Sequence, residues 1–273
     1  MLNFVKHLRL FSKPKFRLSI CNRLQSSLAP STVSKKSKEL PDGIVLEFLN
    51  PSTHDLEKVR KLLIDAFVLN QEPVMHALCE RAYSGEPMEK KLPKIERHFE
   101  KFFSDEFLNE KIELGMSVVA IDKNVSDRYI GCTFVERYCG EIYNTEVPSL
   151  RDPFWEHGLR FMSDLQRRAC PFLSQYDPEK ITFMSHSATC PEYVNSGIQL
   201  AIMDLLLSRV AEHGFEIGYC VVTAKSIVKV VENHYGFFPI AEMMYADYEI
   251  NGEKIFAHLA EKHIAAKAMI KFL

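Results

Sequence analysis

Several features that would define a metal, dinucleotide or membrane protein are missing from this sequence. The seven cysteines are scattered, without a Cys-x-x-Cys pair or a Cys/His cluster at zinc-finger spacing. Their odd number, with no secretory leader, favours reduced thiols in an intracellular protein. No GxGxxG follows an early strand, and no apolar run approaches the length of a membrane span. We therefore expect no metal, no dinucleotide-binding fold and no stable membrane insertion.

Acidic residues are absent from the first 38 residues, which contain nine Lys or Arg before the first acid at Glu39. Subtracting that segment from the totals for the chain leaves 25 basic and 36 acidic residues, a net charge of about −11. A duplex nucleic-acid binder would show a basic face, so we expect no nucleic-acid partner. An acidic body is compatible with cationic substrates such as amines. The sequence gives no indication of the oligomeric state.

The N-terminal segment, residues 1–40, is interpreted as a basic leader separate from the domain at 41–273. Apolar residues recur at helical spacing from Met1 to Phe11, with basic residues between them, until Pro14 interrupts the pattern. Serine-rich and further basic sequence follows. This composition is typical of a mitochondrial presequence and predicts the mitochondrial matrix. The alternative is a disordered tail without an address, in a cytoplasmic protein.

Residues 41–273 predict one mixed α/β domain. Periodicity and turn signals predict strands at 44–49, 116–121, 129–138, 181–189 and 216–223. They predict helices at 56–70, 87–108, 152–168, 196–213 and 226–235. A closing strand pair is expected at 238–248 and 253–259 around Asn251-Gly252, followed by a helical tail at 260–272. Residues 139–178 form an insertion before the strand at 181–189. The order predicts a single twisted mixed sheet flanked by helices.

The most informative stretch lies where the strand at 181–189 gives way to a helix. It contains Pro191-Glu192-Tyr193 and then the loop Val194 to Gln199, which opens the helix; Tyr235-Gly236-Phe237 ends the next helix. This order and spacing resemble the GNAT (GCN5-related) N-acetyltransferase superfamily over about residues 44–259. The resemblance implies the GNAT fold and acetyl-CoA as co-substrate.

The same stretch has a chemical rationale. A helix N-terminus offers unpaired N–H groups and a positive dipole to an anion such as the CoA pyrophosphate, and Gly197 allows close backbone approach. The strand edge would hold the pantetheine arm, and the amide near Thr189 would donate to the thioester oxygen. The cofactor-binding residues expected from this resemblance are Ser187, Ala188, Thr189, Val194, Asn195, Ser196, Gly197, Ile198 and Gln199. The loop departs from the family pattern where Val194 replaces Arg or Gln, Asn195 replaces Gly, and Gln199 replaces Gly or Ala.

The amine side of the site is suggested by Glu72-Pro73-Val74-Met75. It resembles the Glu-Pro-Leu element of the insect-type arylalkylamine N-acetyltransferases, in which the glutamate is the general base. Carried over, Glu72 would take a proton from the substrate ammonium, through water. A base is needed because an alkylammonium has a pKa of about 10.

Other candidate residues follow from position. In many GNAT enzymes a Tyr four residues before the Gly of Gly-Phe is the general acid, but Glu232 stands there in this sequence. Tyr235 and Ser226 are the remaining candidates for that catalytic role. His186 and Ser187 lie on the signature strand, where either is expected to contact substrate or to bridge a water to Glu72. Phe67, Met75 and Trp155 are expected to line an apolar acceptor pocket.

The leading hypothesis is an N-acyltransferase (EC 2.3.1 type) that transfers acetyl or a longer acyl group directly from CoA to a small primary amine, such as an arylalkylamine. Three alternatives remain open. Val194 and Gln199 would suit a degenerate GNAT domain that binds CoA or a protein partner without catalysis. An open acceptor groove would instead indicate protein or peptide acetylation. A covalent acyl carrier at Cys190 has no paired His at a recognised spacing to support it.

Overall fold

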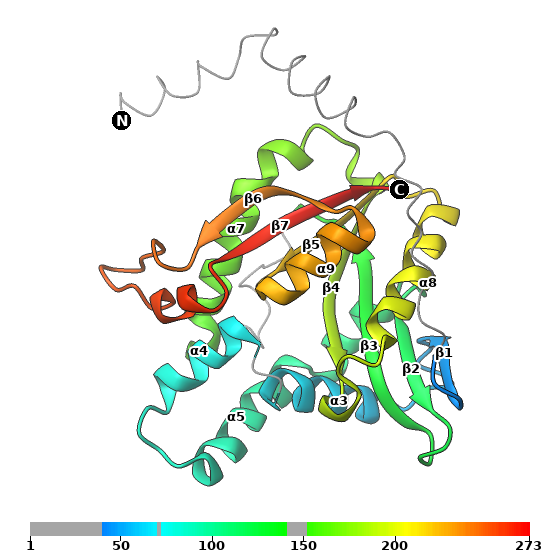
Figure 1. Cartoon of the computed structure of the whole chain (residues 1–273), viewed down its shortest axis with the longest axis horizontal. Coiled ribbons are helices and arrows are strands. Elements are labelled where there is room, and N and C mark those ends of the chain that lie inside the picture. The colour runs from blue at the N-terminus through cyan, green and yellow to red at the C-terminus, as the bar shows by residue number, and fades with distance from the viewer. Residues whose placement is uncertain (1–39, 70–71, 141–151) are drawn as a thin grey trace, which may run out of the picture. The chain divides into compact units, whose positions relative to one another are not determined.

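The computed structural model describes residues 40–69, 72–140 and 152–273 of the chain (Figure 1). The predicted leader lies outside the described residues apart from Leu40, and so does the first part of the predicted insertion, residues 141–151. Every statement below concerns the described ranges.

One open sheet of seven strands organises these residues (Figure 1). In spatial order the strands are β1 (Ile44–Phe48), β2 (Val118–Asp122), β3 (Arg128–Arg137), β4 (Ile181–Thr189), β5 (Ile217–Val222), β7 (Ala265–Phe272) and β6 (Phe238–Met244). Only β4 and β5 pair in parallel, and the other neighbours are antiparallel. The predicted mixed sheet with flanking helices is confirmed.

Seven α-helices in the described ranges cover the two faces of this sheet. One core contains side chains of α3 (Leu56–Leu69), α4 (Pro73–Ala82), α5 (Met88–Phe102), α6 (Asp105–Ile112) and α7 (Glu156–Leu173). The other contains side chains of α8 (Ile198–Glu212) and α9 (Lys225–Tyr235). Burial on both faces explains why β5 is a nearly continuous apolar run.

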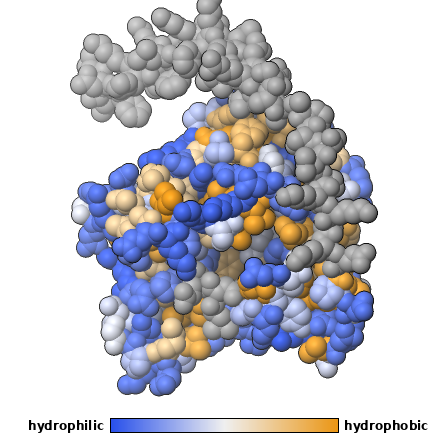
Figure 2. Space-filling model, viewed as in Figure 1, coloured by the Kyte–Doolittle hydropathy of each residue, from blue (hydrophilic) through white to orange (hydrophobic). Residues whose placement is uncertain are grey.

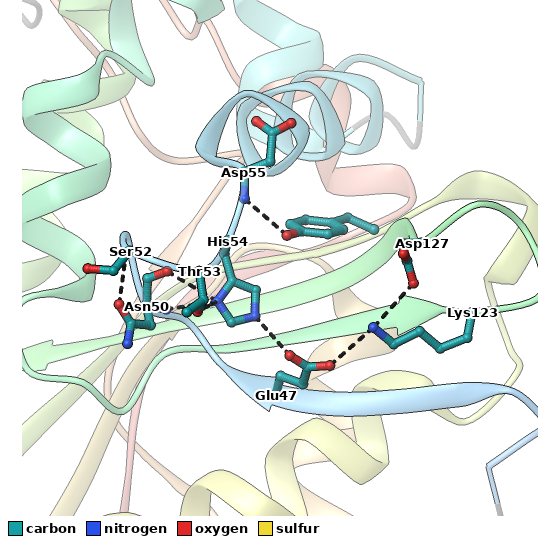
Figure 3. A network of polar contacts seen from close by, with 9 residues as sticks. Glu47, Asn50, Ser52, Thr53, His54, Asp55, Lys123 and Asp127 are labelled. Atoms are coloured by element: carbon teal, nitrogen blue, oxygen red, sulfur yellow. Dashed lines mark hydrogen bonds and ion pairs between the residues drawn. The ribbon is translucent and has the colours of Figure 1, made fainter.

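A polar network fixes the turn from β1 into α3 (Figure 3). The imidazole of His54 accepts the backbone N–H of Asn50 at Nδ1 over 3.1 Å, and its Nε2 lies 3.2 Å from Glu47 of β1. Lys123, just after β2, lies 3.3 Å from the other oxygen of Glu47. The network therefore holds the start of α3 against two strands.

The parallel pair β4–β5 separates partway along its length. Pairing joins Ile181–Met184 to Ile217–Cys220, and from Ser185 onward β4 has no register with β5 in the described chain. On its other side β4 remains paired with β3 as far as Thr189. The two strands thus diverge toward their carboxyl ends, where an open α/β sheet characteristically places its ligand.

A β-bulge in β4 lies at the point of separation. Thr133 of β3 is opposite Ser187, whereas Val135 is opposite Met184, so two steps on β3 match three steps on β4. The extra residue changes which side chains face each layer. As a result His186 faces the α3–α7 layer, where its ring contacts Phe67 of α3.

Three sequence predictions are wrong in detail. The helix expected at 87–108 is two helices, α5 and α6, and α4 was not foreseen. The expected partner strand at 253–259 is instead a bridge residue and a turn, followed by the start of a 3-10 helix, η5 (Ala257–Glu261). The expected helical tail is strand β7, which lies between β5 and β6. The Asn251-Gly252 turn itself is present, with positive φ at both residues, but it closes a single β-bridge.

The described surface is mostly hydrophilic on the face shown in Figure 2, with hydrophobic residues in scattered patches. None of the helices among the described residues combines the length and apolarity required to cross a bilayer.

Candidate active site

Glu72 lies at the start of α4, close to the end of β5. Its side chain caps the helix, because Oε2 accepts the backbone N–H of Met75 over 2.7 Å. Pro73 follows at the first helical position, where its missing N–H costs nothing. The other oxygen, Oε1, accepts a hydrogen bond from Thr223 Oγ1. The carboxylate is therefore fixed at both oxygens, one from its own helix and one from the sheet.

Thr223 connects Glu72 to a buried tyrosine. Its carbonyl oxygen accepts a hydrogen bond from the hydroxyl of Tyr245 over 2.9 Å, and Tyr245 is fully buried directly after β6. Burial raises the pKa of Tyr245, and the nearby Glu72 charge adds to that rise, so the hydroxyl stays protonated. Sequence reasoning missed both residues. The available signal was a threonine directly between the end of a buried strand and the helix that follows.

The pKa of Glu72 is raised above its ordinary value. Removal of the carboxylate from water is the main cause, and the hydrogen bonds from Thr223 and from the amides of Met75 and Val74 act against it. Such a carboxylate is a stronger base than a solvated one. These properties suit a residue that accepts a proton.

His186 lies in an aromatic enclosure on the α3–α7 side of β4. Its ring centroid is 6.0 Å from Phe67, 5.8 Å from both Phe102 and Phe103, and 5.2 Å from Phe107. Burial, and secondarily the charge of a nearby lysine, lowers the pKa of His186 to about 3, so the imidazole is neutral. Its Nδ1 is buried with no hydrogen-bond partner. The enclosure is aromatic, with the ammonium of Lys111 5.2 Å from the centre of the Phe107 ring.

The loop before α8 supplies a helix N-terminus at the other side of the strand divergence. Asn195 and Gly197 both have positive φ, 66° and 91°, and Gly197 is the N-cap residue of α8. The Ser196 hydroxyl donates to the carbonyl of Tyr193, and Val194 is 47% exposed. The first amides of α8 precede the intrahelical ladder, which begins with Ala201 N–H to Gly197 oxygen at 3.0 Å.

The sequence alone does not show where the side chain of Gln199 points. In the structure it points into the sheet and not toward the N-terminal end of α8. Nε2 donates to the carbonyls of Cys132 and Ala188, and Oε1 accepts from Thr133 Oγ1. The Ser187 hydroxyl lies 3.0 Å from the same Thr133 oxygen. Of the predicted cofactor residues, Ser187, Ala188 and Gln199 are therefore joined in one network.

The two candidates for the general acid lie on α9. Ser226 is exposed in the first turn of the helix. Tyr235 is buried in the last turn, and its hydroxyl donates to the carbonyl of Leu200 over 2.7 Å. Burial raises the pKa of Tyr235. The structure thus places Tyr235 as a link between α9 and α8, and its predicted catalytic role stays a prediction, as does that of Ser226.

The predicted acceptor residues separate into two groups. Phe67 and His186 are in ring contact, and Trp155 joins the same aromatic cluster through Phe102. Met75 is half-buried on α4, one turn from Glu72, with which it shares the capping hydrogen bond. Among the described residues there is no group of three or more His, Cys, Asp or Glu arranged to hold a metal ion.

Comparison with known proteins agrees with this architecture. No family model matches the sequence, and no curated protein matches it. Among solved structures, the arylalkylamine N-acetyltransferase 2 from Aedes aegypti has a TM-score of 0.63 and 19% identity, over 85% of this chain and 99% of that one. The mosquito arylalkylamine N-acetyltransferase like 5b has a TM-score of 0.61 and 21% identity, over 84% of this chain and 100% of that one.

A third solved structure, the Drosophila melanogaster polyamine N-acetyltransferase, has a TM-score of 0.60 and 15% identity over 84% of this chain and 100% of that one. The chain has the GNAT fold. The resemblance seen in the Pro-Glu-Tyr, loop and Gly-Phe landmarks is confirmed at the level of fold. In this GNAT fold, β4, the 194–197 loop and α8 follow one another as the sequence predicted.

Proposed function

We propose that this GNAT-fold chain is an acetyl-CoA-dependent N-acetyltransferase that acts on a small primary amine. The observation that carries the proposal is the Glu72 carboxylate, which is desolvated, fixed at both oxygens and located at the end of β5 where β4 and β5 diverge. The three similar structures are N-acetyltransferases, which supports the same chemistry here.

The residues around the strand divergence fit CoA. A phosphate group would meet the first amides of α8 and the left-handed backbone of Asn195 and Gly197. The pantetheine arm would lie along β4 beyond Met184, where β5 no longer pairs. Bound there, the thioester supplies the acetyl group. Val194 leaves this loop without the cationic or amide side chain usual in the family, so the backbone carries the recognition of phosphate.

The reaction removes two protons from the substrate ammonium. The first goes to Glu72, and the free amine attacks the thioester carbonyl. A C–N bond forms, the C–S bond breaks, and the second proton passes from the nitrogen to the departing sulfur, so that CoA leaves as the thiol. The raised pKa of Glu72 brings it nearer to that of the amine and makes the transfer less unfavourable. Water bridges the distance between Glu72 and the amine.

The acceptor side favours an aryl group. Phe67 and Phe107, which are only partly buried, pack beside a neutral His186, and Lys111 lies over the ring of Phe107, so this wall offers apolar area and disfavours a second cation. An arylalkylamine fits this environment better than a polyamine. Met75, half-buried on α4 three residues after Glu72, is the candidate to contact the alkyl arm.

The test combines calorimetry with an activity screen on the full chain. We expect acetyl-CoA to bind with micromolar affinity and phenylethylamines to be acetylated faster than polyamines. Glu72→Gln should bind acetyl-CoA as the wild type does and lose about 10²- to 10⁴-fold in kcat. A folded protein that does not bind acetyl-CoA at millimolar concentration would reject the proposal and favour a degenerate GNAT domain. Turnover of peptides alone would favour protein acetylation.

We also propose that the chain acts in the mitochondrial matrix, on the strength of the basic, serine-rich and acid-free residues 1–38. A fluorescent protein fused after residue 40 should enter mitochondria. Replacing Lys6, Arg9 and Lys13 with Gln should leave it in the cytosol. Cytosolic fluorescence from the unaltered fusion would contradict the proposed mitochondrial location.

A further inference from the structure

Gln199 is the second residue of α8, at a position where the GNAT pattern has Gly or Ala. A side chain at this position either obstructs the N-terminal end of the helix or points away from it. In this chain it points into the sheet. Nε2 donates to Cys132 oxygen over 3.2 Å and to Ala188 oxygen, and Oε1 accepts from Thr133 Oγ1 over 3.1 Å.

The backbone ladder shows what this side chain holds. Cys190 N–H donates to Ile130 oxygen over 2.8 Å. Hydrogen-bonded and non-hydrogen-bonded pairs alternate in an antiparallel ladder, so Cys132 and Ala188, two residues along each strand, form the next hydrogen-bonded pair. Ser187 and Thr189, on either side of Ala188, therefore direct their backbone groups away from β3, toward the side on which β5 has diverged. Gln199 thus binds β4 between the two residues whose backbones face the divergence.

The start of α8 lies unusually close to β3. A Cβ atom on Gly131 would stand 2.9 Å from Ile198 Cγ2, which is too close for a side chain, and 3.4 Å from Ile202 Cδ1. Gly131 therefore permits the contact, and Gln199 adds hydrogen bonds beside it. The Ser187 hydroxyl, 3.0 Å from Thr133 Oγ1, extends the network to the edge of β4.

We infer that Gln199 is a positioning residue that fixes the N-terminus of α8 relative to the diverging edge of β4. This inference rests on the proposed function, because these two elements would hold opposite ends of CoA: the phosphates at the helix and the pantetheine arm at the strand. A fixed separation lets both ends bind at once without reordering. Gln199 itself does not touch the reacting atoms.

The experiment compares whole and partial ligands. Calorimetry on the full chain measures acetyl-CoA and adenosine 3′,5′-diphosphate with Gln199→Met, which keeps the length of the side chain, and with Gln199→Ala, which restores the family residue. We expect both variants to weaken the binding of acetyl-CoA about tenfold, the equivalent of one or two net hydrogen bonds. The affinity for adenosine 3′,5′-diphosphate should change less than twofold, because this ligand would contact the helix end alone. Gln175→Ala is the matched control, since Gln175 also donates to a backbone carbonyl, that of Pro171 over 2.9 Å, on an exposed surface.

Each contrary result has a distinct meaning. Tighter acetyl-CoA binding by Gln199→Ala would show that the side chain obstructs the ligand and would overturn the inference. Equal losses for both ligands would show a local effect on the helix end and would also overturn it. Unchanged affinity for both ligands would do the same. If the wild type itself does not bind acetyl-CoA, the proposed function fails first.

Discussion

Glu72 has properties that a purely structural carboxylate would not need. A helix cap can be made by Ser, Thr, Asp or Asn, with no desolvation of a longer acid. Here the carboxylate is also desolvated and tied to Thr223 on the sheet, and its pKa is raised. Sequence reasoning identified Glu72 from a two-residue match. It could not find Thr223, because the contact joins residues 151 positions apart that only the fold brings together.

The first prediction concerns Thr223→Val. The hydroxyl of Thr223 lowers the pKa of Glu72 by donating to the carboxylate, so its loss should raise that pKa further. The acidic limb of the kcat/KM profile should therefore move to higher pH, because the base must be deprotonated to act. Thr223→Ser should restore the wild-type profile. A profile unmoved by Thr223→Val would show that the hydroxyl does not bind the catalytic carboxylate.

The second prediction concerns stability and pH. A carboxyl group whose pKa is raised on folding favours the folded state while it is protonated, below its unfolded pKa of about 4.3. That contribution is lost as pH rises through the folded pKa. The free energy of unfolding of the wild type, minus that of Glu72→Gln, should therefore decrease as the pH is raised from 4 to 8. Urea denaturation at a series of pH values measures it. A flat or rising difference would contradict the raised pKa.

The elements that the sequence predicted well are those with strong local signals. The run 181–189 is bounded by Pro178 and Pro191 and is strand β4 with the predicted limits. Helix α4 was not predicted, although its start had a local signal in Glu72-Pro73, an acidic cap followed by proline at the first helical position. The C-terminal segment Ala265–Phe272 has helix-forming Ala and Lys, but hydrogen bonding to β5 on one side and β6 on the other outweighs that propensity.

The third prediction compares two glycines that bound the same helix. Gly197 precedes α8 with φ 91° and Gly214 follows it with φ 79°. Alanine at either position should destabilise the fold by about 1–2 kcal/mol, because L-residues are strained in this region. Only Gly197→Ala should also weaken acetyl-CoA binding, measured by calorimetry alongside thermal unfolding. Equal affinity losses in both variants would mean that the effect is one of stability and not of the phosphate loop.

At the scale of the whole molecule, charge is the property that sequence alone gives reliably. The chain beyond residue 38 carries 25 basic and 36 acidic residues. Composition reports the total but not its distribution, so the acidic excess bears on encounter with ligands and not on the identity of the amine. The aromatic enclosure around His186 was beyond sequence reasoning for the same reason. Its rings come from α3, α5 and α6 and meet only through tertiary packing.

The fourth prediction follows from this net charge. A cationic amine should be attracted and anionic acetyl-CoA repelled, and salt should screen both effects. Raising NaCl from 20 to 500 mM, roughly a fivefold shortening of the Debye length, should lower kcat/KM for the amine and raise it for acetyl-CoA. Steady-state kinetics with each substrate varied in turn measures both slopes. Parallel slopes would mean that salt acts on the enzyme and not on the encounter.

Strand β7 has a consequence for the order in which the molecule can be assembled. It lies between β5 and β6, and β6 has no other partner in the sheet. As the chain leaves the ribosome, or a translocation pore, β6 emerges with both edges unpaired. It can pair only after β7, the last strand of the described chain, has also emerged. Until then Tyr245, directly after β6, is not held against Thr223, and the support behind Glu72 is incomplete. The proposed base would thus become functional only at the final step of folding, and a product truncated before residue 265 would present adhesive strand edges to its neighbours.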